Sequence, residues 1–257
     1  MRKTVPLILI TLAALSVFPR IACAVNEAES ASVYNRAGTL YREGKFSESL
    51  ELYEQLIGEG IANPDLLYNA ANAAYRLDSP GKAVLYLERA LRLAPSDEDA
   101  LSNLAVINSI KQDKDPVNDN PVVAFITRRY NAVNINSAAL WSGLSFAFAM
   151  LCATGILIMT DWKRLTAAGI TALCSVIFFL STVMLIEKVH HRNTVVEAVI
   201  MAENAQAYSG PGADNTHIFT VHEGTKVEIQ RRQDTWNLIR LKSGAGAWVE
   251  AGVMEII

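Results

Sequence analysis

Three asparagines recur along the chain at a constant step of 34 residues, as Asn35, Asn69 and Asn103. An amide side chain carries both hydrogen-bond donors and an acceptor, so a row of amides can pair with the backbone of an extended peptide. Such a row recognises a partner and requires no covalent chemistry. The sequence leaves open whether these amides contact a ligand or serve each repeat internally.

Further polar and aromatic residues follow the asparagines on the same spacing. In a helix they would lie one to two turns beyond the amides and could share one surface with them. The expected protein-binding residues are Asn35, Asn69, Asn103, Tyr41, Tyr75, Arg42 and Arg76.

No residue pattern in the chain indicates catalysis or metal binding. The four histidines are His190, His191, His217 and His222, and none has the second histidine that a zinc-protease helix requires four residues later. Glycine-rich phosphate loops, nucleophile elbows and paired cysteines are also missing from the sequence. We therefore predict a protein that is not an enzyme, with no catalytic residues, no metal and no cofactor.

The repeat period also carries small residues, at Ala37, Ala71 and Ala105, where paired helices could approach closely. A period of this length is typical of stacked helix pairs, none of which can bury its apolar face alone. The pattern resembles the tetratricopeptide repeat (TPR), with two full repeats and a closing helix over residues 25–113. Helices are expected over 30–43, 46–58, 64–77, 80–93 and 97–111. The resemblance implies protein partners.

Charge argues against nucleic acid as a partner. The formal net charge of the chain is −3, and the repeat segment holds fourteen acidic and eight basic side chains. Nucleic-acid binding needs clustered lysine and arginine to displace counterions.

The first residues have the form of a secretory signal peptide, expected over 1–24. Arg2 and Lys3 precede an apolar run, and Ala22 and Ala24 fit a small-residue cleavage site. Lipidation of Cys23 is the alternative to ordinary cleavage. With the other two cysteines in apolar segments, no disulfide is expected in the exported parts.

Two later segments, 138–160 and 165–186, lack charged side chains and are long enough to cross a bilayer of about 30 Å. They predict a transmembrane hairpin with a turn at 161–164. A linker and juxtamembrane segment, 114–137, precedes it, and its residues 122–133 form either a short helix at the lipid surface or a plain loop. Two crossings would return the C-terminal region to the compartment of the repeats, the periplasmic side of a bacterial inner membrane. Without ionisable residues in the spans, transport is not expected.

The last expected domain covers residues 187–257, and from Asn193 the pattern changes to short β-rich runs separated by turn clusters. These runs predict five strands, over 195–201, 218–221, 226–230, 236–241 and 247–249, and a small barrel. The turns at 209–211 and 223–227, with Trp236 and Trp248, resemble the bacterial SH3-like domain. Tyr208, Trp236 and Trp248 either fill the core or form a groove for a peptide or glycan. The predicted fold class is therefore multidomain: an all-α array, a membrane hairpin and an all-β SH3-like barrel.

The order of these segments resembles the BatE-like proteins of the bacterial aerotolerance (Bat) operon. That resemblance implies a membrane-anchored adaptor or scaffold, with von Willebrand factor A-type membrane proteins among its partners. The alternative function is a cell-wall protein that binds peptidoglycan and recruits a wall enzyme.

Overall fold

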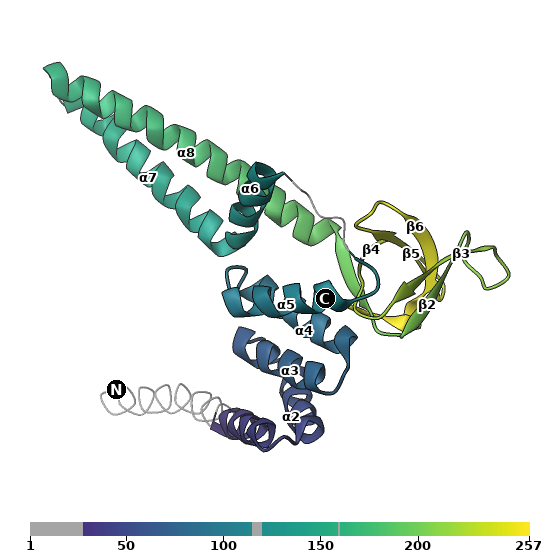
Figure 1. Cartoon of the computed structure of the whole chain (residues 1–257). Helices are drawn as coiled ribbons and strands as arrows, with labels where there is room; N and C mark the ends of the chain where they lie inside the picture. The colour runs from purple at the N-terminus through teal and green to yellow at the C-terminus, as the bar shows by residue number, and fades with distance from the viewer. Residues whose placement is uncertain (1–27, 115–119, 159) are drawn as a thin grey trace, which may run out of the picture.

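The computed structural model describes residues 28–114, 120–158 and 160–257. The expected signal peptide and Cys23 lie outside these residues, as do residues 115–119 of the expected linker. From the N-terminal side the described chain forms an array of antiparallel helices, a long helix pair that projects away from it, and an antiparallel sheet beside the array (Figure 1).

The array contains a helix over 28–42, then α2 (Phe46–Gly58), α3 (Pro64–Arg76), α4 (Pro80–Leu93) and α5 (Glu98–Ile110). Asn63 caps α3 and Asp97 caps α5, each by accepting hydrogen bonds from two backbone N–H groups of the first turn. Pro80 begins α4 as expected, but the Ser79 side chain makes no capping bond. These ends match the repeat period closely.

Small residues allow the helices of each pair to approach. Ala37 and Ala71 are almost completely buried, and the buried Ser49 hydroxyl donates to the Ala37 carbonyl oxygen at 2.8 Å. Ala105 occupies the third equivalent position but is exposed. The expectation that it packs between two helices is wrong, because this side of α5 is open to solvent among the described residues.

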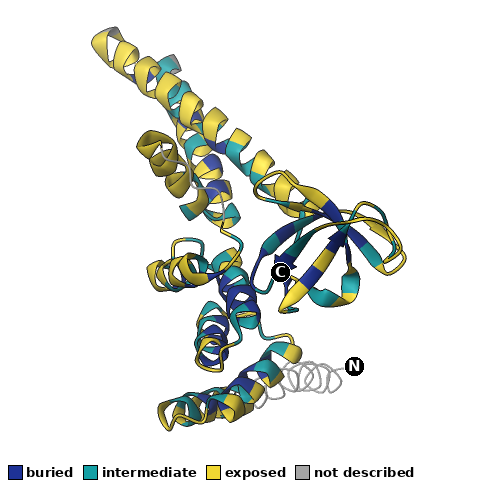
Figure 2. Ribbon diagram, turned by 45° about the vertical axis from the view of Figure 1, so that its right-hand side comes forward, coloured by how far each residue is buried: buried dark blue, intermediate teal, exposed yellow. Residues whose placement is uncertain are grey.

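The projecting pair consists of α7 (Ile135–Ile158) and α8 (Asp161–Thr194), preceded by the short helix α6 (Pro121–Ala132). Both long helices are long and apolar enough to cross a membrane. They pack through Ser142 and Thr182, whose hydroxyl oxygens are 2.8 Å apart, and most of their surface is exposed (Figure 2). The juxtamembrane segment is helical, and its place at a lipid surface stays a prediction.

The C-terminal sheet has seven strands in the order β3-β2-β6-β5-β4-β1-β7. They are β1 (Val196–Ile200), β2 (Asn204–Tyr208), β3 (His217–His222), β4 (Lys226–Gln233), β5 (Trp236–Leu241), β6 (Gly246–Glu250) and β7 (Met254–Ile256). The expected count of five was too low. Within residues 195–257, all described, β3 and β7 form no ladder with each other, so the sheet is open where a closed barrel was expected.

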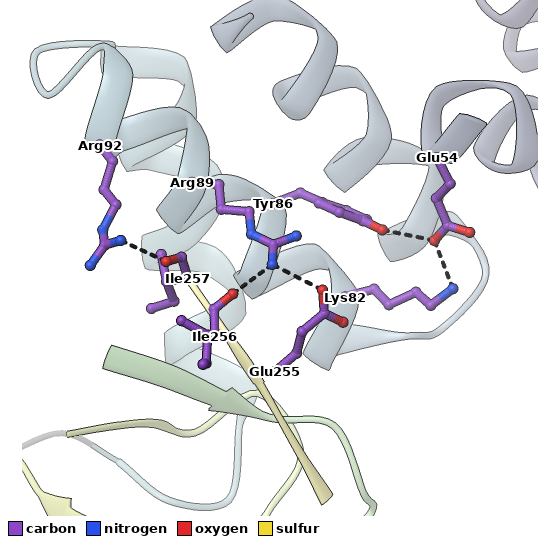
Figure 3. A network of polar contacts seen from close by, with 8 residues as sticks. All are labelled: Glu54, Lys82, Tyr86, Arg89, Arg92, Glu255, Ile256 and Ile257. Atoms are coloured by element: carbon purple, nitrogen blue, oxygen red, sulfur yellow. Dashed lines mark hydrogen bonds and ion pairs between the residues drawn. The ribbon is translucent and has the colours of Figure 1, made fainter. Parts of the chain in front are cut away.

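Helix α4 carries the sheet on its outer surface. Val199 of β1 and Ile257 are buried in the same apolar cluster as Leu85 and Leu87 of α4. Arg89 donates to Glu255 and to the Ile256 carbonyl oxygen, and Arg92 donates to the Ile257 carbonyl oxygen (Figure 3). Because the contact combines apolar burial with charge-assisted hydrogen bonds, it fixes the sheet against the array.

A half-buried lysine strengthens the same contact. The Lys226 ammonium lies 2.9 Å from Glu88 of α4 and 3.0 Å from Glu197 of β1. Burial lowers the pKa of Lys226, but the two carboxylates raise it by more, so the pKa lies above its ordinary value. The lysine therefore remains charged between its two partners.

Candidate protein-binding groove

The first helices of the repeats present a polar groove, separate from the surface that carries the sheet. A hollow of about 430 Å³ lies on the helix 28–42 and on α3. Four of the predicted residues, Asn35, Tyr41, Arg42 and Asn69, line this hollow. The sheet contacts α4 and Asp113 instead, and none of these contacts involves a residue that lines the hollow.

A tyrosine and an asparagine pair across each repeat boundary. The Asn69 amide nitrogen donates to the Tyr34 hydroxyl at 2.7 Å, and the Asn103 amide nitrogen donates to the Tyr68 hydroxyl at 3.2 Å. The two contacts are related by the repeat itself. Part of the hydrogen-bonding capacity of the asparagines therefore joins successive repeats.

Tyr34 is a groove residue that the sequence prediction omitted. The signal was present, because Tyr34 and Tyr68 recur on the repeat step and each lies 35 residues before its asparagine partner. The Tyr34 ring also lies 5.8 Å from the Tyr53 ring, centroid to centroid. Burial raises the pKa of Tyr53, which also lines the hollow, so its hydroxyl stays protonated there.

Asn103 and Tyr75 lie in a second, smaller hollow of about 140 Å³. Its remaining lining is largely apolar and includes Val106 and Ile107 of α5. An extended peptide crossing both hollows would contact the amide groups of the first hollow and then the apolar side chains of the second. This change of chemistry along the groove is a source of specificity.

Arg76 does not line either hollow. Its guanidinium lies 4.2 Å from the centre of the Phe46 ring, a cation–π contact. Tyr41 packs edge-on against the same ring at 5.2 Å. Arg76 therefore holds the turn that joins the helix 28–42 to α2, whereas Arg42 lies in the groove and donates to the Thr39 hydroxyl at 3.0 Å.

The sheet carries a second candidate surface. Tyr208, Trp236 and Trp248 are half-buried on its outer face, whereas its core consists of small aliphatic residues such as Val249 and Ile239. The Tyr208 and Trp236 rings meet edge-on at 5.6 Å and line a pocket of about 470 Å³. Trp248 lies directly opposite Tyr208 in the ladder but outside that pocket.

Across residues 28–114, 120–158 and 160–257, no three histidine, cysteine, aspartate or glutamate side chains come close enough to hold a metal ion. His222 is engaged with Asp113, at 3.0 Å between ring Nδ1 and carboxylate Oδ1. His190 and His191 lie in the last turns of α8 and His217 begins β3.

Comparison with known proteins leaves the family open. No family model matches the chain, and no curated protein matches it. Among solved structures, the TPR domain of Sgt2 from Aspergillus fumigatus is similar over 64% of this chain and 82% of its own, with 16% identity and a TM-score of 0.30. A likeness at that level does not establish a shared fold. The helical repeats are shown instead by the helix ends and packing contacts of this chain.

Proposed function

We propose that this chain is a non-enzymatic, membrane-anchored scaffold that binds partner proteins in the groove of a short TPR array. The observation that carries the proposal is the hollow lined by Asn35, Tyr41, Arg42 and Asn69, in which Asn35 and Asn69 are equivalent positions of successive repeats. Amide and guanidinium groups spaced in this way suit the backbone of an extended segment. The C-terminal sheet serves as an SH3-like module beside it.

The docked sheet supports the topology of the scaffold. The array and the sheet contact one another through α4, so both lie on the same side of any membrane that α7 and α8 cross. Two crossings meet this requirement and one does not. We place both modules on the periplasmic side of a bacterial inner membrane, within an aerotolerance-type complex whose partners include von Willebrand factor A-type membrane proteins.

The test is crosslinking in intact cells with the full-length chain, purification in mild detergent, and identification of the proteins that co-purify. A groove variant, Asn35→Ala with Arg42→Ala, should lose the partner. The matched control is Glu51→Ala, an exposed residue of α2 outside both hollows. Equal recovery of every partner with the groove variant and the control would refute the groove.

A second function is favoured by one specific observation, the half-buried aromatic pair Tyr208 and Trp236. Aromatic faces beside polar groups such as Gln206 and Glu250 can stack on sugar rings. In this alternative the sheet binds peptidoglycan and the repeats recruit a wall enzyme. Sedimentation with purified sacculi distinguishes the two, because an adaptor of membrane proteins stays in the supernatant.

A further inference from the structure

A pocket of about 350 Å³ lies where the helical array, the projecting helix pair and the first strand meet. Its lining combines Arg92 at the end of α4, Tyr130 and Asn134 around the α6–α7 connection, and Lys188 and Arg192 in the last turns of α8. Separate parts of the chain therefore bring several hydrogen-bond donors to one concave site.

The sequence of α8 shows that the pocket lies just beyond the end of its uncharged segment. No charged side chain occurs from Leu165 to Ile186, and Glu187 and Lys188 follow immediately. The neighbouring helix α7 begins at Ile135, beside the same pocket. If α7 and α8 cross a bilayer as proposed above, the pocket lies at the level of the lipid headgroups.

Two cations in the pocket are available to an anion. The Lys188 ammonium lies 4.1 Å from the centre of the Tyr130 ring, and Arg192 follows one helical turn later on the same face. Within the part of the chain that the structure describes, neither side chain forms an ion pair at 4.0 Å or less. Arg92 differs, because it is bonded to the Ile257 carbonyl oxygen.

The acidic residues of the pocket do not cancel these cations. Glu197 is paired with Lys226 at 3.0 Å and with Arg92 at 3.5 Å, so its charge is already balanced. Glu187 is exposed and is the remaining opposing charge. Lys188 and Arg192 thus leave a surplus of positive charge, and the amides of the α6–α7 connection add neutral donors. A phosphodiester with a single negative charge fits this set.

We propose that the pocket binds the phosphate headgroup of an anionic phospholipid, held by Lys188 and Arg192. The acyl chains would lie against the exposed apolar surface of α7 and α8. The inference rests on the membrane anchoring proposed above and adds a lipid ligand to it. Basic pockets at the ends of transmembrane helices select anionic headgroups because opposite charges meet where water is partly excluded.

The experiment uses the full-length chain in nanodiscs of phosphatidylcholine with and without a minority of phosphatidylglycerol. Phosphatidylglycerol retained after transfer to detergent is counted by native mass spectrometry. The double variant Lys188→Gln with Arg192→Gln should bind phosphatidylglycerol about 30-fold more weakly. The matched control is Lys163→Gln with Arg164→Gln, two basic residues at the other end of the helix pair, and it should retain the lipid.

Further measurements separate the alternatives. Lys188→Arg keeps the charge and should retain binding, whereas equal losses in both double variants would show bulk attraction and overturn the pocket. Displacement of the lipid by inorganic phosphate at similar concentration would make the ligand a free anion and also overturn the proposal. Extraction of the chain from membranes by alkaline carbonate would instead refute the anchoring, while an integrated chain without lipid selectivity refutes only the pocket.

Discussion

The carboxylate of Asp113 is bound twice by His222, at 2.7 Å from its backbone N–H and at 3.0 Å from its ring Nδ1. The Thr225 hydroxyl donates to the same carboxylate at 2.9 Å. Asp113 lies just beyond the last helix of the array, and its partners flank the turn between β3 and β4. The chain is therefore tied to the sheet before it enters the membrane hairpin proposed here.

The Asp113 contact should respond to acid. Partial burial raises the pKa of Asp113, but the hydrogen bonds from His222 and Thr225 lower it by more, so the pKa lies below its ordinary value of 3.8. The ionised carboxylate therefore stabilises the contact above that value, and the contribution is lost as the pH falls through the folded pKa. We expect the His222 amide proton, followed by NMR, to titrate with a midpoint below 3.8. Asp113→Asn should abolish this transition, and a midpoint above 3.8 would contradict the geometry.

The two alanines at equivalent repeat positions should respond differently to enlargement. Ala71 is 1% exposed between packed helices, whereas Ala105 is exposed on α5. Ala71→Leu should lower the free energy of unfolding by about 1–3 kcal/mol because the core must move to accept it. Ala105→Leu should change it by less than about 0.5 kcal/mol. Thermal unfolding of the full-length chain in detergent compares the two, and equal effects would mean that the packing differs from that described.

Local patterns predicted the array well because each helix is set by its own periodicity and end signals. The helix 46–58 was expected with the bounds that α2 has, from its periodicity and from Gly44 at the preceding bend. In the structure Gly44 and Gly60 take positive φ angles on either side of it. Strand β2 was missed because its buried positions are alanines, Ala205 and Ala207, which do not mark a strand by composition.

The docking of the sheet could not be predicted from local sequence. Arg89 and Glu255 are 166 residues apart, and each alone is an ordinary surface charge. The groove could also be predicted only in part, because Arg42 and Arg76 are equivalent in the repeat but contact different partners. The difference arises because the Phe46 ring lies beside Arg76. The 34-residue repeat spacing alone does not predict this contact.

A glycine in α4 should be required for docking. A Cβ on Gly81 would lie 3.1 Å from the Ile200 carbonyl oxygen and 2.8 Å from the Glu223 side chain, which also accepts a hydrogen bond from the Gly81 N–H. Gly81→Ala should therefore loosen the sheet and raise amide exchange in β1 and β7 about five-fold or more.

The matched control for Gly81 is Gly58, whose added Cβ would meet nothing within 4 Å. Gly58→Ala should leave exchange in the sheet unchanged and stabilise α2 by about 0.5–1 kcal/mol, since alanine loses less backbone entropy in a helix. Hydrogen-exchange mass spectrometry measures the amide exchange rates of both variants. Unchanged exchange in Gly81→Ala would place the sheet elsewhere than on α4.

The outer aromatic residues of the sheet should be separable from its core. Ile239 is fully buried, and Ile239→Ala should cost about 2–5 kcal/mol of unfolding free energy. Trp236 is half-buried and meets Tyr208 edge-on, so Trp236→Ala should cost about 1 kcal/mol from the lost aromatic pair and leave the sheet folded. A folded Trp236→Ala variant then tests function cleanly: loss of sacculus binding would favour the cell-wall alternative, and unchanged partner recovery would leave the repeat groove as the binding site. Unfolding of the sheet by Trp236→Ala would show instead that this residue belongs to the core.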